Sequence, residues 1–124
     1  MRRLSPRGVA FVCAGVAVAV AFVPIAYAVG IRDWDPSGLV RMSAEEPMAG
    51  LAVRNDPDFK FVHPQAHYDG VYFYAVAVDP FARGEAHELI DKSAYRYGHA
   101  GYGWLAWIVS LGSAGAVPLA LMLL

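Results

Sequence analysis

Residues 8–31 read GVAFVCAGVAVAVAFVPIAYAVGI, an unbroken stretch without a charged side chain. A helix needs about 20 apolar residues to cross a hydrocarbon layer roughly 30 Å thick, so this stretch is long enough to span one. Arg2, Arg3 and Arg7 precede it, and basic residues beside a first span hold that end in the cytoplasm. We therefore expect residues 1–7 to form a cytoplasmic N-terminus and residues 8–31 to form a first transmembrane helix.

The same stretch has features of a secretory signal. A basic start and an apolar core lead to Ala26-Tyr27-Ala28, which has the small-x-small pattern of a cleavage site. Against this interpretation, the apolar run continues to Ile31, which is longer than the usual signal core. An uncleaved span is favoured, and both interpretations place the following residues on the far side of the membrane.

A second uncharged stretch covers Ala100 to Leu124, and Trp104 and Trp107 near its start are typical of a membrane surface. We expect residues 97–124 to form a second transmembrane helix. Small residues and a proline interrupt this stretch, namely Gly112, Ser113, Gly115 and Pro118. The span is therefore expected either to be kinked or to end near Leu111, with the start of a third span after it. The apolar ending suggests an N-terminal part of a larger membrane protein.

The residues between the two stretches form a charged loop, residues 32–96. It holds all eleven acidic residues of the chain and seven of the ten basic ones, so it is net acidic. The net charge of the chain is −1, which gives no sign of a nucleic-acid partner. With one cysteine, Cys13, no disulfide can form within the chain. The predicted class is a mainly α integral membrane protein with an extracytoplasmic loop.

The most informative part of the loop is the segment from His67 to Pro80. Asp69 is expected to cap a helix that runs to Val78 and is closed by Asp79-Pro80. Such a helix is apolar and aromatic on nearly every side, which is typical of a helix in the membrane interface. A carboxylate at Asp69 would be partly desolvated there, which suits it to general-base work, although helix capping is the simpler role.

The pattern Tyr68-Asp69-Gly70-x-x-Phe73-Tyr74-x-x-Ala77, followed by Tyr95-Arg96-Tyr97, resembles polytopic GT-C glycosyltransferases, in particular PIG-V-like mannosyltransferases. The resemblance implies transfer of a sugar from a polyprenyl-phosphate donor to an acceptor hydroxyl with inversion of configuration. It implies Asp69 as the catalytic base and Arg96 as a contact for the lipid phosphate. It also implies that Tyr68 and Tyr72 border the substrate. Arg96 is equally well interpreted as an interfacial anchor that reaches lipid headgroups.

Two other classes of function remain open. A small two-span accessory or assembly subunit, with its loop bound to a membrane-protein partner, explains the short chain. A secreted domain anchored at its C-terminus would follow from cleavage after Ala28. No cofactor motif is present, since the chain has no Gly-rich phosphate loop, CxxC pair or haem-attachment motif. His63 and His67 have metal-ligand spacing for a helix, but Pro64 makes a helix through both unfavourable, and we expect no metal site.

Overall fold

The computed structural model describes residues 5–63 and 68–124 of the chain. Within these residues every regular element is a helix, and one parallel bridge pairs Ser43 with Val62. The predicted mainly α class is therefore confirmed. His67, one of the two histidines considered as metal ligands, lies outside the described residues.

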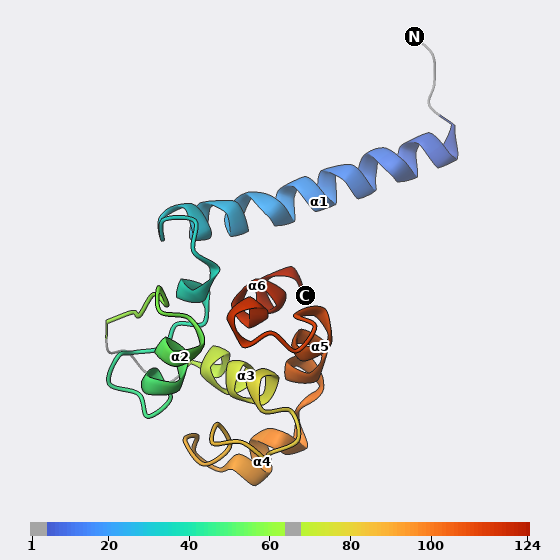
Figure 1. Ribbon diagram of the computed structural model, residues 1–124. Coiled ribbons are helices and arrows are strands. Elements are labelled where there is room, and N and C mark those ends of the chain that lie inside the picture. The colour runs from blue at the N-terminus through green and yellow to red at the C-terminus, as the bar shows by residue number, and fades with distance from the viewer. Residues whose placement is uncertain (1–4, 64–67) are drawn as a thin grey trace.

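The first helix, α1, extends from Pro6 to Gly30 and projects from the rest of the molecule (Figure 1). Ser5 begins it by accepting a hydrogen bond from the Gly8 N–H at 3.2 Å, and Pro6 fits the first turn. At 1.5 Å per residue its 25 residues extend about 37 Å, enough to cross a bilayer. Among the described residues it is the one helix long and apolar enough to do so alone.

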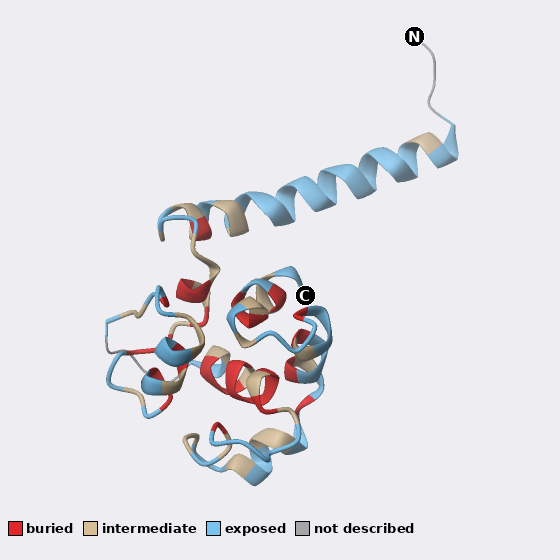
Figure 2. Ribbon diagram, viewed as in Figure 1, coloured by how far each residue is buried: buried red, intermediate tan, exposed pale blue. Residues whose placement is uncertain are grey.

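The surface of α1 is almost wholly exposed, as Figure 2 shows. Val29 is its one buried residue, and the helix continues through Pro24 without a break. A helix that is apolar on all sides and unpacked against protein has the properties of a membrane span rather than of a core helix. Its extent agrees with the predicted first span, residues 8–31.

The segment after α1 consists of turns with two short helices, the 3₁₀ helix η1 (Pro36–Leu39) and α2 (Ala49–Asn55). Asp35 caps η1, with Oδ1 accepting from the Ser37 N–H at 2.9 Å. The Ser37 hydroxyl is buried and accepts from the Lys60 N–H at 2.8 Å. This bond fixes the extended piece around Lys60 against η1.

The core of the molecule is built around α3, Asp69–Val78. Its bounds match the predicted helix, and it packs most extensively against α5 (Gly101–Val109) and then α6 (Val117–Leu123). Gly103 lets α5 approach closely, because a Cβ there would lie 2.6 Å from Cγ1 of Val76. The expectation that this helix lies in the membrane interface stays a prediction, and the structure adds that other segments of the chain pack around it. Protein covers most of its surface, and Figure 2 shows it as the most continuous buried helix.

The predicted second span, residues 97–124, is divided in the structure. After α4 (Ser93–Gly98) come α5, the short helix η2 (Ala114–Ala116) and α6. The part from α5 to the end of α6 is bent by 112°, so it is no straight helix. α5 ends at Val109, close to the alternative end expected near Leu111.

The chain reverses between α5 and η2 because two successive residues adopt left-handed backbone angles. Leu111 has φ +55° and Gly112 has φ +74°. The hydroxyl of Tyr102, early in α5, donates to the main-chain oxygen of Leu121, late in α6, at 2.5 Å. This bond holds the beginning of α5 and the end of α6 together.

Candidate functional site

Three of the four predicted site residues line one pocket of about 200 Å³ between α3 and α4. Asp69 and Tyr72 come from the first turn of α3, and Arg96 comes from α4. The remaining lining residues are mainly aromatic or apolar, namely Phe73, Val76, Tyr95 and His99. The site therefore combines a carboxylate, a guanidinium and aromatic ring faces.

Arg96 lies at the centre of this pocket. Its guanidinium carbon is 3.5 Å from the centroid of the Tyr72 ring, which is a close cation–π contact. Nη1 lies 3.5 Å from Oδ1 of Asp69, and Nη2 lies 3.5 Å from Oδ1 of Asp91. Both distances exceed those of strong charge-assisted hydrogen bonds, so the two ion pairs are loose. The Nε atom is buried and has no hydrogen-bond partner among the described residues.

Asp69 is the first residue of α3, and Tyr68 precedes the helix as its N-cap residue. No side chain caps this helix in the described part of the chain, so the expectation that Asp69 is the capping residue is wrong. Its charge nevertheless lies in the first turn, where the helix dipole favours an anion. The side chain is 75% exposed, so the protein itself does not desolvate it as predicted. The carboxylate is open to a ligand from solution.

Tyr72 is buried beneath Arg96, and its hydroxyl interacts with the Asp91 carboxylate. Burial raises the pKa of Tyr72, the Asp91 contact raises it further, and the Arg96 charge opposes both. The interaction with Tyr72 in turn lowers the pKa of Asp91, and the charge of Arg96 lowers it further. Tyr72 therefore favours the anion of Asp91, whereas the contact that Asp69 makes with Arg96 is loose.

Tyr68, the fourth predicted site residue, is not among the residues that line the pocket. Its ring lies under Arg41, whose guanidinium carbon is 3.9 Å from the ring centroid. It joins the start of α3 to the segment between α1 and α2 rather than to α4. The structure thus separates Tyr68 from Asp69, Tyr72 and Arg96.

Gly70, beside the candidate base, is required by packing. A Cβ at this position would lie 2.5 Å from the main-chain oxygen of Val40, and that oxygen cannot move without its backbone. We expect Gly70→Ala to lower the free energy of unfolding by about 2 kcal/mol, as overpacking does elsewhere. Chemical unfolding in a mild detergent, followed by near-ultraviolet circular dichroism, measures this.

The matched control for Gly70→Ala is Gly98→Ala. A Cβ at Gly98 meets nothing within 4 Å, so its effect should stay within about 0.5 kcal/mol. Equal effects of the two substitutions would show that the contact with Val40 does not restrict Gly70.

A second polar cluster, centred on Asp79, was not predicted as a site. Asp79 is 8% exposed, and its Oδ1 accepts from the N–H groups of Arg83 and Gly84 at 2.8 and 2.9 Å. Its Oδ2 lies 3.0 Å from Nδ1 of His87, and its main-chain oxygen accepts from the Tyr97 hydroxyl at 2.7 Å. The sequence signal was Asp-Pro followed by Gly84, which indicates a turn but does not identify its hydrogen-bond partners.

The structural role of Asp79 follows from these bonds. It organises the turn after α3, and through Tyr97 it holds α4, which carries Arg96. Asp79 closes α3 as predicted and in addition positions one side of the candidate site. In residues 5–63 and 68–124 no group of three or more His, Cys, Asp or Glu side chains could hold a metal ion.

Comparison of the chain with protein-family models, with curated proteins and with solved structures gives no match. The functional argument therefore depends on the geometry of the site and on the chemistry of its side chains.

Proposed function

We propose that this chain forms the membrane anchor and the acceptor-activating loop of a GT-C-like glycosyltransferase that uses a polyprenyl-phosphate sugar. The observation that carries the proposal is the pocket that joins Asp69, Tyr72 and Arg96, which are up to 27 residues apart in the sequence. An exposed carboxylate beside a guanidinium and aromatic faces is the combination that sugar transfer from a phosphate requires.

In the proposed reaction Asp69 accepts the proton of the acceptor hydroxyl. The hydroxyl oxygen forms a bond to the anomeric carbon of the sugar while the bond from that carbon to the phosphate oxygen breaks. The polyprenyl phosphate leaves from the opposite face with the bonding electrons, and the configuration inverts. The carboxylate is accessible for this step because its side chain is 75% exposed and its contact with Arg96 is long.

Arg96 would bind the departing phosphate, and the aromatic rings would pack against the sugar. The two Nη atoms present parallel N–H groups that match two phosphate oxygens. Loose contacts at 3.5 Å with Asp69 and Asp91 can be exchanged for a phosphate, whereas tight ones would resist it. The rings of Tyr72 and Tyr95 flank the guanidinium and offer apolar faces.

The proposed location is a bacterial plasma membrane, with α1 as the anchor. The basic residues before α1 favour a cytoplasmic N-terminus, which places the acidic loop and the pocket on the outer face. A lipid-linked donor would present its phosphate at that face, while its hydrocarbon tail stays in the bilayer.

The test compares Asp69→Asn with Asp91→Asn in the full chain reconstituted into lipid nanodiscs. The measurement is transfer of radiolabelled mannose from polyprenyl-phosphate mannose to a soluble alkyl glycoside. Loss of a general base costs roughly 100-fold or more in rate, so Asp69→Asn should lose at least that. Asp91→Asn also removes one negative charge and one partner of Arg96, and it should lose less than tenfold.

Equal losses of transfer rate in the two variants would mean that Asp69 acts only as an ion-pair partner of Arg96. Retained transfer by Asp69→Asn would remove Asp69 from the mechanism.

A second candidate is a non-catalytic accessory subunit of a membrane assembly. The observation in its favour is that Arg96 already contacts Asp69, Asp91 and the Tyr72 ring, so these residues can serve only to hold α4 against α3. This candidate is favoured if the wild-type chain shows no transfer and copurifies with one membrane protein in stoichiometric amount.

A further inference from the structure

We propose that α5 and α6 form a re-entrant helix pair, which enters the half of the bilayer next to the C-terminal end of α1 and returns to the side it came from. The partner is the hydrocarbon layer of the membrane. The inference depends on α1 spanning the bilayer and does not depend on sugar transfer.

The first step concerns length. α5 has 9 residues and α6 has 7, so at 1.5 Å per residue they extend about 14 Å and about 11 Å. Neither can cross a layer roughly 30 Å thick. The bend of 112° prevents the two from adding their lengths in one direction.

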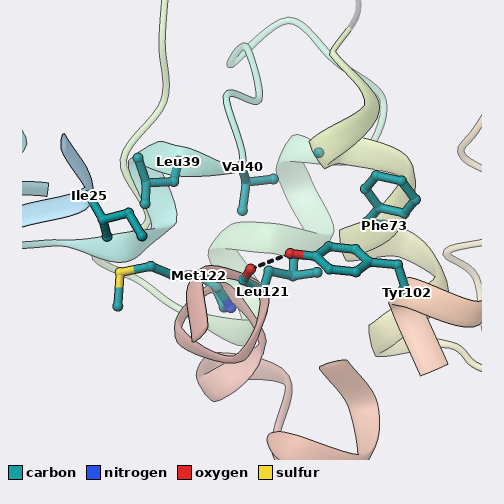
Figure 3. A pocket seen from close by; sticks show the side chains of 9 residues that line it. Ile25, Leu39, Val40, Phe73, Tyr102, Leu121 and Met122 are labelled. Carbon is teal, nitrogen blue, oxygen red and sulfur yellow. Dashed lines mark hydrogen bonds between the residues drawn. The ribbon is translucent and has the colours of Figure 1, made fainter. Parts of the chain in front are cut away.

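The second step concerns where α5 and α6 meet. In a single straight span, Tyr102 and Leu121 would be separated by 19 residues, or about 28 Å. The structure instead joins them by a hydrogen bond of 2.5 Å, which Figure 3 shows as a dashed line. The chain therefore returns to the level at which α5 began.

The third step concerns depth along α1. Leu119 and Met122 of α6 share an apolar pocket with Phe22, Ile25 and Val29 of α1. Phe22 is eight residues before Gly30, which places it about 12 Å from the end of α1. Trp34 and Pro36, which follow α1, line the same pocket, so if α1 spans the membrane, α6 lies between the level of Phe22 and the outer surface of the hydrocarbon. In Figure 1 α6 is drawn below the C-terminal half of α1, and α5 lies farther from α1 than α6 does.

The fourth step concerns the surface that the pair presents. Large apolar side chains of α5 and of the reversal are exposed, and Leu111 is 92% exposed. The exposed set in this part of the chain is Trp104, Leu105, Ile108, Val109 and Leu111. None of the residues from 100 to 124 is charged. This apolar surface adjoins the exposed helix α1, and lipid chains are the apolar partner that suits both.

The space between the pair and α1 is apolar as well. A cavity of about 390 Å³ is lined by Ile25 of α1, Phe73 of α3 and Met122 of α6, among others (Figure 3). The hydroxyl of Tyr102 faces it but is already bonded to Leu121. No other side chain that lines this cavity is polar, so hydrocarbon can fill it without leaving a side-chain polar group unsatisfied.

The first experiment maps sidedness by thiol labelling in intact bacterial spheroplasts with a membrane-impermeant maleimide. In the full chain carrying Cys13→Ser, a short Gly-Ser tail ending in cysteine is appended after Leu124. Asp58→Cys marks the side of the loop, and Ser5→Cys marks the side of the N-terminus. We expect the tail to be labelled together with Asp58→Cys, whereas Ser5→Cys reacts only after permeabilisation. Labelling of the tail together with Ser5→Cys means that the pair crosses the membrane, and it overturns the proposal.

The second experiment measures depth by tryptophan fluorescence in vesicles of brominated phosphatidylcholine. Trp34→Phe leaves Trp104 and Trp107 as emitters. If the pair is re-entrant, the emission of Trp104 and Trp107 in brominated vesicles should be at most half of their emission in vesicles without bromine. Unquenched emission means that α5 lies in water or against another protein, and it overturns the proposal.

Discussion

Replacing Tyr74 by alanine should lower the free energy of unfolding by about 4 kcal/mol, the largest effect expected of any single substitution in this chain. Tyr74 is fully buried in the centre of α3. Its ring packs edge-on against Phe59 with 5.6 Å between centroids. Truncation removes the ring from the contact between α3 and the segment after α2, and it leaves a cavity that the helices cannot close.

The control for this prediction is Tyr74→Phe. The Tyr74 hydroxyl accepts a long hydrogen bond of 3.4 Å from Asn55 Nδ2, so its loss should cost at most about 1 kcal/mol. Chemical unfolding of wild type and both variants in the same detergent gives the comparison. If the phenylalanine variant loses as much as the alanine variant, the hydroxyl rather than ring packing holds α3 in place.

The elements that the sequence predicted well are those whose local signals agree with their packing. α1 follows from an uncharged run preceded by Ser5 and Pro6, and nothing in the rest of the chain competes with it. α3 begins at Asp69 and ends before Asp79-Pro80, as predicted, because a proline disfavours helix at the residue before it. Its burial was not predicted, since an apolar helix has the same composition in a core and at a membrane surface.

The elements that sequence patterns did not define depend on tertiary contacts. The segment from Glu85 to Asp91 consists of turns and bends. The Asp79 carboxylate accepts hydrogen bonds from the N–H groups of Arg83 and Gly84. These bonds fix a turn just before Glu85, where a helix would otherwise begin. In the second apolar stretch, the sequence left open a kinked span or an end near Leu111, and the left-handed angles at Leu111 and Gly112 reverse the chain there.

In the candidate site, too, the sequence indicated the residues, whereas tertiary contacts determine their arrangement. Asp69 and Arg96 were chosen from a short motif and a following Tyr-Arg-Tyr, and the structure brings them to 3.5 Å. Spacing alone could not give that distance, because it depends on where α4 docks. The hydrogen bond from Tyr97 to Asp79 sets this docking, and neither residue belongs to the motif. Tyr68 shows the limit of a motif, since its ring packs under Arg41, away from the pocket.

Replacing Asp79 by alanine should lower the free energy of unfolding by about 3 kcal/mol. The substitution removes a buried carboxylate and leaves the N–H groups of Arg83 and Gly84 without their acceptor. A hydrogen bond to a charged group contributes about 1.5–3 kcal/mol, and the bonds to one carboxylate are not fully additive. Asp79→Asn keeps one oxygen for those N–H groups and should lose about half as much. A loss below about 1 kcal/mol for Asp79→Ala would mean that the turn is held by other contacts.

The pH dependence of stability gives an independent check on Asp79. Burial alone would raise the pKa of this carboxyl, but hydrogen bonds from the Gly84 N–H, from His87 and from the Arg83 N–H outweigh burial and lower it. The unfolded chain, with the ordinary value near 3.8, therefore binds the proton more readily than the folded chain. The stability that Asp79 contributes is complete above that value and is lost as the pH falls through the lowered pKa. The difference in unfolding free energy between wild type and Asp79→Asn should thus shrink as the pH falls below about 4. A difference that stays constant in acid would show that the carboxylate charge does not stabilise the turn.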